Sequence, residues 1–152
     1  MWTVDKRYLN ANHFVTQREF NSQYKLRPAD NAILTDKDPN YRVLDLSVDV
    51  FNDSHTSYFH KTIGGYSAAK LQRYQDMIDY FIIPEIQNLG NALKQSPTLS
   101  AIEGSLSQQK ALNMLNAKYI IIDPNSAPIN NRFVYGNAWF VKDYELVDTP
   151  DD

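Results

Sequence analysis

The longest periodic run of apolar residues lies in the middle of the chain, and its spacing predicts a long helix. Apolar side chains recur there three or four positions apart, which places them on one face of a helix. Ser67 precedes the run and is expected to be its N-cap. Pro84 is expected to end or kink the helix, because proline has no N–H to donate, and to start a second helix in which Gly90 is a weak point. The apolar face consists of Leu71, Tyr74, Ile78, Phe81 and Ile82, followed by Ile86, Leu89 and Leu93.

Shorter apolar runs, rich in Val, Leu and Ile, predict strands. Tyr41–Val48 alternates between apolar and polar residues and is expected to be one strand. Lys118–Asp123 is closed by Pro124 and is the candidate for the central strand. Two more strands are expected at Phe133–Tyr135 and Ala138–Val147, joined by a turn at Gly136-Asn137.

Short helices and loops account for the remaining residues. Helices are expected at Thr16–Gln23, Pro28–Leu34 and Ser107–Leu115, a turn at Asp36–Asn40, and loops at Phe51–Tyr66, Gln95–Gly104 and Pro124–Asn131. Because helices and strands occur without strict alternation, the expected fold class is α+β, with a small mixed sheet covered by helices in a single pair of layers. A chain of 152 residues has the usual size of one domain, so residues 1–152 are expected to form a single soluble domain.

Composition and charge exclude several classes of function. A formal net charge of -3 argues against a nucleic-acid partner, because such proteins present a basic surface. The chain has no cysteine, so disulfide bonds, thiolate nucleophiles and cysteine-ligated zinc are excluded. No run approaches the roughly 18 apolar residues of a membrane-spanning helix, and the first residues lack the apolar core of a signal peptide.

The richest candidate for ligand binding precedes the predicted long helix. Two glycines and a lysine ahead of a helix N-terminus could hold an anion such as phosphate, through backbone N–H groups and the positive end of the helix dipole. In the alternative, structural interpretation, the glycines form a tight turn, while Lys70 and Arg73 pair with Asp76 on a solvated helix face. The candidate ligand-binding residues are His60, Lys61, Gly64, Gly65, Tyr66, Lys70 and Arg73.

Other candidate sites are supported by fewer features of the sequence. His55 and His60, with Asp53, could be drawn as a metal site, but a spacing of five does not place both imidazoles on one helix face, so hydrogen-bonded loop residues are expected instead. No nucleophile elbow occurs, and no pair of carboxylates stands out as general acid and base. Tyr66, Trp139 and Tyr58 lie in or near loops and could stack on sugars or serve an interface. No catalytic residue, cofactor or metal is expected.

Several stretches of the sequence together resemble a known family. They are Tyr41–Leu44, Phe51–Tyr66 with Ala69–Gln75, Leu112–Ile121 and Gly136–Phe140. The set looks like the extracytoplasmic region of the YfhO-like bacterial membrane proteins, in the form found in Bacteroides and its relatives, and the likeness covers most of residues 41–147. Proteins of that family are large and polytopic, and they are similar to the glycosyltransferase C superfamily, which uses polyprenyl-phosphate sugars to modify cell-envelope polymers.

The resemblance implies that the chain is a soluble piece of a larger multi-pass protein, on the extracytoplasmic side of a bacterial cell membrane. In the superfamily the catalytic acidic residues lie in a loop between early transmembrane helices; no such loop is present, so no catalytic residue is carried over. The implied role is accessory: binding a glycan acceptor or a lipid-linked sugar donor, with membrane segments of the same protein as partners. The alternative is a structural or protein-interaction domain without a ligand. A free-standing cytosolic enzyme is disfavoured, because no catalytic constellation is present.

Overall fold

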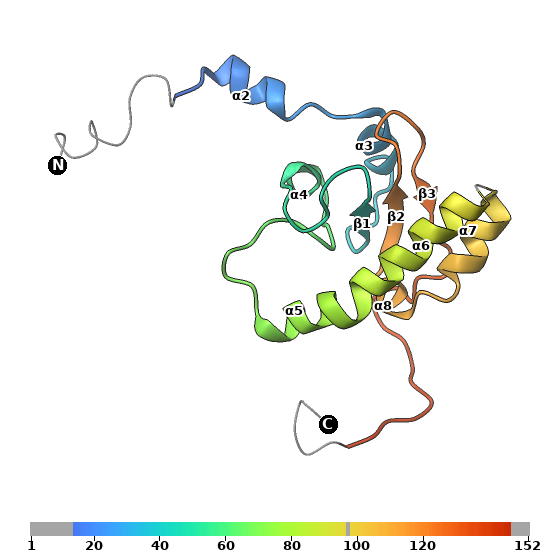
Figure 1. The fold of residues 1–152 in the computed structure, drawn as a ribbon. Helices are drawn as coiled ribbons and strands as arrows, with labels where there is room; N and C mark the ends of the chain where they lie inside the picture. Colours follow the sequence, from blue (N-terminus) through green and yellow to red (C-terminus); the bar gives the residue numbers. More distant parts are fainter. Residues whose placement is uncertain (1–13, 97, 147–152) are drawn as a thin grey trace.

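Two parallel strands and a short antiparallel third strand form the sheet of the fold (Figure 1). The computed structural model describes residues 14–96 and 98–146. Helices and a small mixed sheet coexist, which confirms the predicted α+β class. The elements are α2 (Gln17–Gln23), α3 (Pro28–Ile33), β1 (Arg42–Asp45), α4 (His55–Phe59), α5 (Gln72–Met77), the π-helix η2 (Ile78–Ile82), α6 (Ile83–Gln95), α7 (Leu99–Leu106), α8 (Lys110–Met114), β2 (Ala117–Ile121) and β3 (Ile129–Asn130).

The central strand lies where the sequence predicts it. β2 pairs in parallel with β1 and antiparallel with β3, so the candidate Lys118–Asp123 is confirmed with a small displacement toward the N-terminus. The predicted strand Tyr41–Val48 is shorter in the structure. It ends at Asp45 because the Oδ1 atom of this residue accepts the N–H of Ser47 at 2.9 Å and turns the chain.

The two strands predicted near the C-terminus are wrong. Neither Phe133–Tyr135 nor the described part of Ala138–Val147 is a strand, and Val147 itself lies outside the described residues. β3 lies instead within Pro124–Asn131, which was predicted as a loop. β-branched and aromatic residues favour a sheet surface, but a strand also needs a neighbouring backbone to pair with.

Hydrogen bonds to α8 and to the first residue of β2 explain why the chain leaves the sheet after β3. The side-chain amide of Asn131 donates to Asn113 Oδ1 at 2.8 Å and to Ala117 O at 3.1 Å. The N–H of Tyr135 donates to the backbone oxygen of Asn113 at 3.1 Å. These bonds direct residues 131–135 toward α8, away from the line of β3.

A single helical rod, made of α5, η2 and α6, runs from Gln72 to Gln95. Its N-cap is Leu71 and not Ser67, because the backbone oxygen of Leu71 accepts the first N–H bonds of the rod. Pro84 does not end it. The N–H of Ile83 donates to Ile78 O, five residues back, and this wider π turn accommodates the Pro84 ring in the first turn of α6, where a missing N–H is tolerated.

The buried side of the rod agrees with the predicted apolar face in its centre only. Ile78, Ile82 and Leu89 are at most 1% exposed and belong to the core. Leu71 is 78% exposed and Phe81 is 59% exposed. Leu71 precedes the first turn, and the additional residue in the π turn rotates Phe81 off the buried face.

Two segments predicted as loops contain helices. α4 lies within Phe51–Tyr66, and most of α7 lies within Gln95–Gly104. α7 forms despite its glycine because Ile102 and Leu106, one turn apart, are both buried in the core, and burial of one face outweighs weak helix propensity.

The remaining predicted helices are present, one of them shortened. Thr16–Gln23 and Pro28–Leu34 correspond to α2 and α3. The predicted helix Ser107–Leu115 is reduced to α8, because Ser107 belongs to the end of α7 as its C-cap.

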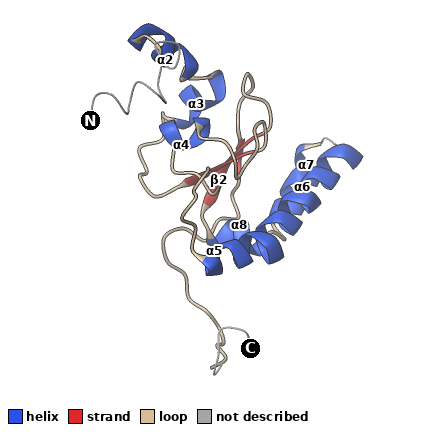
Figure 2. Ribbon diagram, turned by 60° about the vertical axis from the view of Figure 1, so that its left-hand side comes forward, coloured by secondary structure: helices blue, strands red, loops and turns tan. Residues whose placement is uncertain are grey.

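Apolar residues of the strands pack against helices on both faces of the sheet. Leu44 and Ile120 join the larger core cluster with residues of the rod, α7 and α8. Val43 and Ile121 join a smaller cluster with Ile33 of α3. This division follows the alternation of side chains along a strand. Figure 2 shows α3 and α4 on one side of the sheet and the rod with α7 on the other.

Glu85 connects the rod to α8, and its removal should weaken that contact. Its carboxylate accepts the N–H groups of Ala111 at 2.8 Å and Leu112 at 2.9 Å, which are free donors in the first turn of α8. We expect Glu85→Ala to lower the free energy of unfolding by about 1–2 kcal/mol in urea denaturation, as for the loss of a helix cap. Glu145→Ala, an exposed control, should have no measurable effect. Equal effects of both changes would contradict the bridging role.

Candidate functional site

The two glycines of the predicted anion-binding loop pack against Val50. A Cβ atom at Gly64 would lie 1.7 Å from the backbone oxygen of Val50. Gly65 has a φ of +99° and donates its N–H to the same oxygen at 2.7 Å. α5 begins only at Gln72, so these glycines do not form its N-terminus. Their geometry is that of close backbone packing.

Two ring-bearing members of the predicted set lie in opposite environments. The His60 side chain is buried, and its Nε2 atom lies 3.1 Å from Asp30 Oδ1. Tyr66 is 69% exposed. His60 therefore belongs to the interior, whereas Tyr66 lies on the surface.

Lys70 and Arg73, two cationic residues of the predicted ligand-binding set, do not line the pocket that contains Lys61. The Nζ atom of Lys70 donates to Gln75 Oε1 at 3.2 Å, and Arg73 is exposed. Asp76 accepts a hydrogen bond from Gln72 Nε2 at 2.7 Å. The predicted ion pairs of Asp76 with Lys70 and Arg73 are not among the ion pairs of the described residues.

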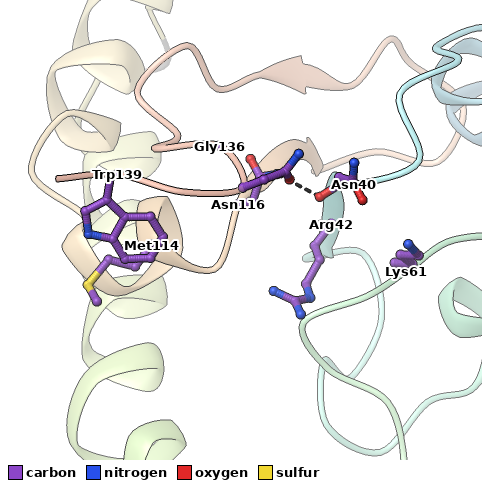
Figure 3. A pocket seen from close by; sticks show the side chains of 8 residues that line it. Asn40, Arg42, Lys61, Met114, Asn116, Gly136 and Trp139 are labelled. Carbon is purple, nitrogen blue, oxygen red and sulfur yellow. Dashed lines mark hydrogen bonds between the residues drawn. The ribbon is translucent and has the colours of Figure 1, made fainter.

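Lys61 is the member of the predicted set that lines a pocket, shown in Figure 3. The pocket has a volume of about 360 Å³. Its walls come from β1 and the turn before it, the chain after α4, the end of α8 with its connection to β2, and the segment after β3. The lining residues are Asn40, Arg42, Lys61, Met114, Asn116, Gly136, Asn137 and Trp139.

Two cationic side chains occupy one part of the pocket. Arg42 is the first residue of β1. Lys61 lies beside β1, because its backbone oxygen accepts the N–H of Val43 at 2.8 Å and Val43 forms a parallel bridge with Thr62. Two positively charged residues 19 positions apart in the chain thus line the same pocket.

An apolar wall faces these cations across the pocket. Figure 3 shows Trp139 and Met114 on the side of the pocket away from Arg42 and Lys61. The centroid of the Trp139 ring lies 5.6 Å from that of the Tyr135 ring. The backbone N–H of Tyr135 donates to the backbone oxygen of Asn113, and this bond holds Tyr135 against α8. A flat indole beside polar groups suits stacking against a sugar ring.

The charge of the pocket is not neutralised by carboxylates. Nη1 of Arg42 donates to Leu115 O at 2.9 Å, and Nζ of Lys61 donates to Pro39 O at 2.5 Å; both acceptors are uncharged. No carboxylate lines the pocket, and neither cation joins an ion pair within the described part of the chain. A guanidinium, an ammonium and asparagine amides can together bind anionic and hydroxyl oxygens.

A second group of polar residues lies in the interior and joins α3, β1 and α4. Arg27 contacts both Asp30 and Asp45, with N–O distances of 2.7 Å to each. Asp45 also accepts from the buried hydroxyl of Thr56 at 2.7 Å. His60 completes the group through Asp30. Asp30 and Asp45 are 0% and 2% exposed, so this group has no open surface for a ligand.

The charges in this buried group are held by their neighbours. Burial alone would raise the pKa of Asp30, but hydrogen bonds from Arg27 and His60 bring that pKa down to about 2. Burial lowers the pKa of His60, and this effect exceeds the opposite one of Asp30. No group of three or more His, Asp or Glu side chains in the described residues is arranged to hold a metal ion. Asp53, His55 and His60 are therefore not brought together as metal ligands.

Apart from Asn40, the residues that line the pocket come from four of the sequence stretches quoted in the sequence analysis. Tyr41–Leu44 contributes Arg42, Phe51–Tyr66 contributes Lys61, Leu112–Ile121 contributes Met114 and Asn116, and Gly136–Phe140 contributes Gly136, Asn137 and Trp139. Sequence reasoning singled out Lys61 and Trp139 but missed Arg42 and the asparagines. Nothing in the local sequence around these residues indicates that they lie close together, because their proximity depends on how β1, β2 and the segment after β3 are arranged.

No protein-family model, curated protein or solved structure matches the chain. Among the described residues, no helix is both long and apolar enough to cross a membrane.

Proposed function

We propose that the chain is an extracytoplasmic accessory domain of a YfhO-like membrane glycosyltransferase, and that its pocket binds the phosphate-linked sugar of a lipid-linked donor. The domain does not catalyse transfer itself. The polytopic part of the same protein supplies the catalysis, and the domain presents or retains the donor beside it. Both the family and the membrane location rest on the resemblance of the sequence segments.

The observation that carries this proposal is that both Arg42 and Lys61 line a pocket without a carboxylate. In a chain with a formal net charge of -3, an uncompensated positive pocket favours an anionic ligand over a neutral one. Trp139 and the side-chain amides of Asn40 and Asn137 add stacking and hydrogen bonds of the kind that sugars use. A phosphate-bearing sugar has both features, so the donor fits the pocket better than a neutral acceptor glycan.

The alternative function, a structural or interaction domain with no ligand, is favoured by a different observation. Gly64 and Gly65 pack on Val50, and the adjacent Ile63 is 2% exposed in the core. The loop predicted to bind an anion therefore packs against the core and supports the fold. The two functions differ in whether the neighbouring pocket binds anything.

Binding of glucose 1-phosphate to the purified 152-residue chain, followed by NMR titration, separates the two functions. We expect the wild-type chain to bind it and to bind glucose at least tenfold more weakly, because charge-assisted hydrogen bonds contribute about 1.5–3 kcal/mol. Arg42→Ala and Lys61→Ala should each weaken binding about tenfold or more. Arg73→Ala should not, since Arg73 is exposed and lies outside the pocket.

In the full-length protein, Lys61→Ala should reduce glycan transfer and Arg73→Ala should not. Equal binding of glucose and its phosphate would contradict recognition of the anion. Absence of binding to either compound, with unchanged transfer by Lys61→Ala, would favour the structural alternative.

A further inference from the structure

Asn116 has an unusual backbone conformation at the edge of the pocket. Its φ is +58°, and it is the one non-glycine residue with positive φ among the described residues. It stands between Leu115, which caps α8, and the first residue of β2. Asparagine after a helix end often adopts this left-handed conformation, so the helix end accounts for the backbone of Asn116. It does not account for the side chain.

The side chain of Asn116 reaches across to the segment that enters β1. Its Nδ2 atom donates to the backbone oxygen of Asn40 at 2.7 Å, and Figure 3 shows this bond at the edge of the pocket. The backbone oxygen of Asn116 accepts the N–H of Arg42 at 2.9 Å. Asn116 therefore holds the residues on both sides of Tyr41, and both of them line the pocket.

The pairing of β1 with β2 is irregular at this point. Arg42 pairs with Ala117, but Val43 pairs with Tyr119, so Lys118 has no partner on β1. The N–H of Lys118 donates to the backbone oxygen of Asn116 at 2.8 Å. An additional residue in one strand changes the direction of the side chains beside it, and such bulges often lie next to functional sites.

We propose that Asn116 is the positioning residue of the pocket: its side-chain bond to Asn40, together with the bulge after it, directs Arg42 toward the ligand. Nη1 of Arg42 donates to Leu115 O, so its guanidinium is oriented by the residue next to Asn116. This inference rests on the proposed function, because it assigns Arg42 to the binding of the ligand anion. Asn116 acts through Arg42 and Asn40 and need not touch the ligand.

Asn116→Gly is the informative change. Glycine keeps the positive φ and the helix end, and it removes the side chain and with it the Nδ2 donor to Asn40 O. We expect its affinity for glucose 1-phosphate to fall about fivefold to tenfold, measured well below its Tm, while its Tm stays within a few degrees of wild type. Asn125→Gly, at an exposed asparagine in the loop before β3, is the matched control and should retain wild-type affinity.

A purely structural role would lower the Tm of Asn116→Gly and leave the affinity of the folded protein unchanged, which would overturn the inference. Hydrogen exchange of the Arg42 amide provides a readout that needs no ligand. We expect that exchange to become at least fivefold faster in Asn116→Gly, and an unchanged rate would also overturn the inference. If the wild-type chain fails to bind, the proposed function fails, and a faster Arg42 exchange would still support the positioning of Arg42 by Asn116.

Discussion

Gly64→Ala is expected to lower the free energy of unfolding by more than about 3 kcal/mol, or to prevent folding. The new Cβ atom would lie 1.7 Å from Val50 O, 2.7 Å from Val50 C and 2.8 Å from Val50 Cγ1. Two of these atoms belong to the backbone and cannot rotate away. Moving them would break the bond from Gly65 N–H to Val50 O, which measures 2.7 Å. Thermal and urea denaturation followed by circular dichroism measure the loss.

Gly90→Ala provides the matched control for this prediction. Gly90 lies inside α6, and no heavy atom lies within 4 Å of a Cβ built on it. Alanine has a higher helix propensity than glycine, so this variant should gain about 0.5–1 kcal/mol of stability. If Gly64→Ala behaved like Gly90→Ala, the close packing of the loop on Val50 would be refuted.

Arg27→Met is expected to cost about 3–5 kcal/mol at pH 7, because it leaves two buried carboxylates without their cation. Arg27 is 15% exposed and contacts Asp30 and Asp45, which are 0% and 2% exposed. Arg132→Met is the control: Arg132 is exposed and takes part in no ion pair among the described residues. It should change stability by less than about 0.5 kcal/mol.

The pH dependence of stability gives a second test of the same group. The folded-state pKa of Asp30 is lowered from 3.8 to about 2, so the stability it contributes is complete above pH 4 and disappears as the pH falls through 2. The wild-type chain should lose about 2 kcal/mol from Asp30 over this interval. In Arg27→Met, burial acts on the carboxylates without the guanidinium, so acid should relieve their repulsion. The free energies of unfolding of wild type and Arg27→Met, plotted against pH, should therefore converge below pH 4. A constant difference between them across this range would contradict the ion-pair role.

These predictions depend on contacts of very different sequence separation. In the buried polar group, Arg27 contacts Asp30, three residues away, and Asp45, 18 residues away. Asp30 also meets His60, 30 residues away. Helix start signals around Pro28 predict α3 correctly, but they carry no information about which strand or loop will supply its polar partners.

The rod illustrates both sides of sequence-based prediction. The three-and-four spacing of Ile78, Ile82 and Leu89 identifies a buried helix face, because that spacing is a local property. The path at Pro84 is decided by the packing of Ile78 and Ile82 on the sheet, which retains the helix through a π turn. Propensity alone favours a break there.

The candidate site follows the same division. The sequence indicates Lys61 as a candidate because it lies near two glycines, and Trp139 because it is an aromatic residue near a predicted turn. The sequence does not indicate Arg42 as a binding residue, because the pattern of a strand of four residues carries no signal for ligand binding. Parallel pairing of β1 with β2 brings Arg42 beside Asn116, 74 residues later in the chain, and thereby forms the cationic part of the pocket.

The sequence by itself determined the α+β class, the central strand, the helices α2 and α3 and the centre of the buried rod face, since each follows from periodicity and capping within a few residues. The tertiary structure alone decided that Gly64 packs on Val50, that residues 133–146 do not form strands, and that four distant segments meet at Arg42, Lys61, Asn116 and Trp139. The physical reason is that local propensity sets which face of an element is apolar. The neighbour that covers this face depends on chain topology and on the combined packing of the whole core.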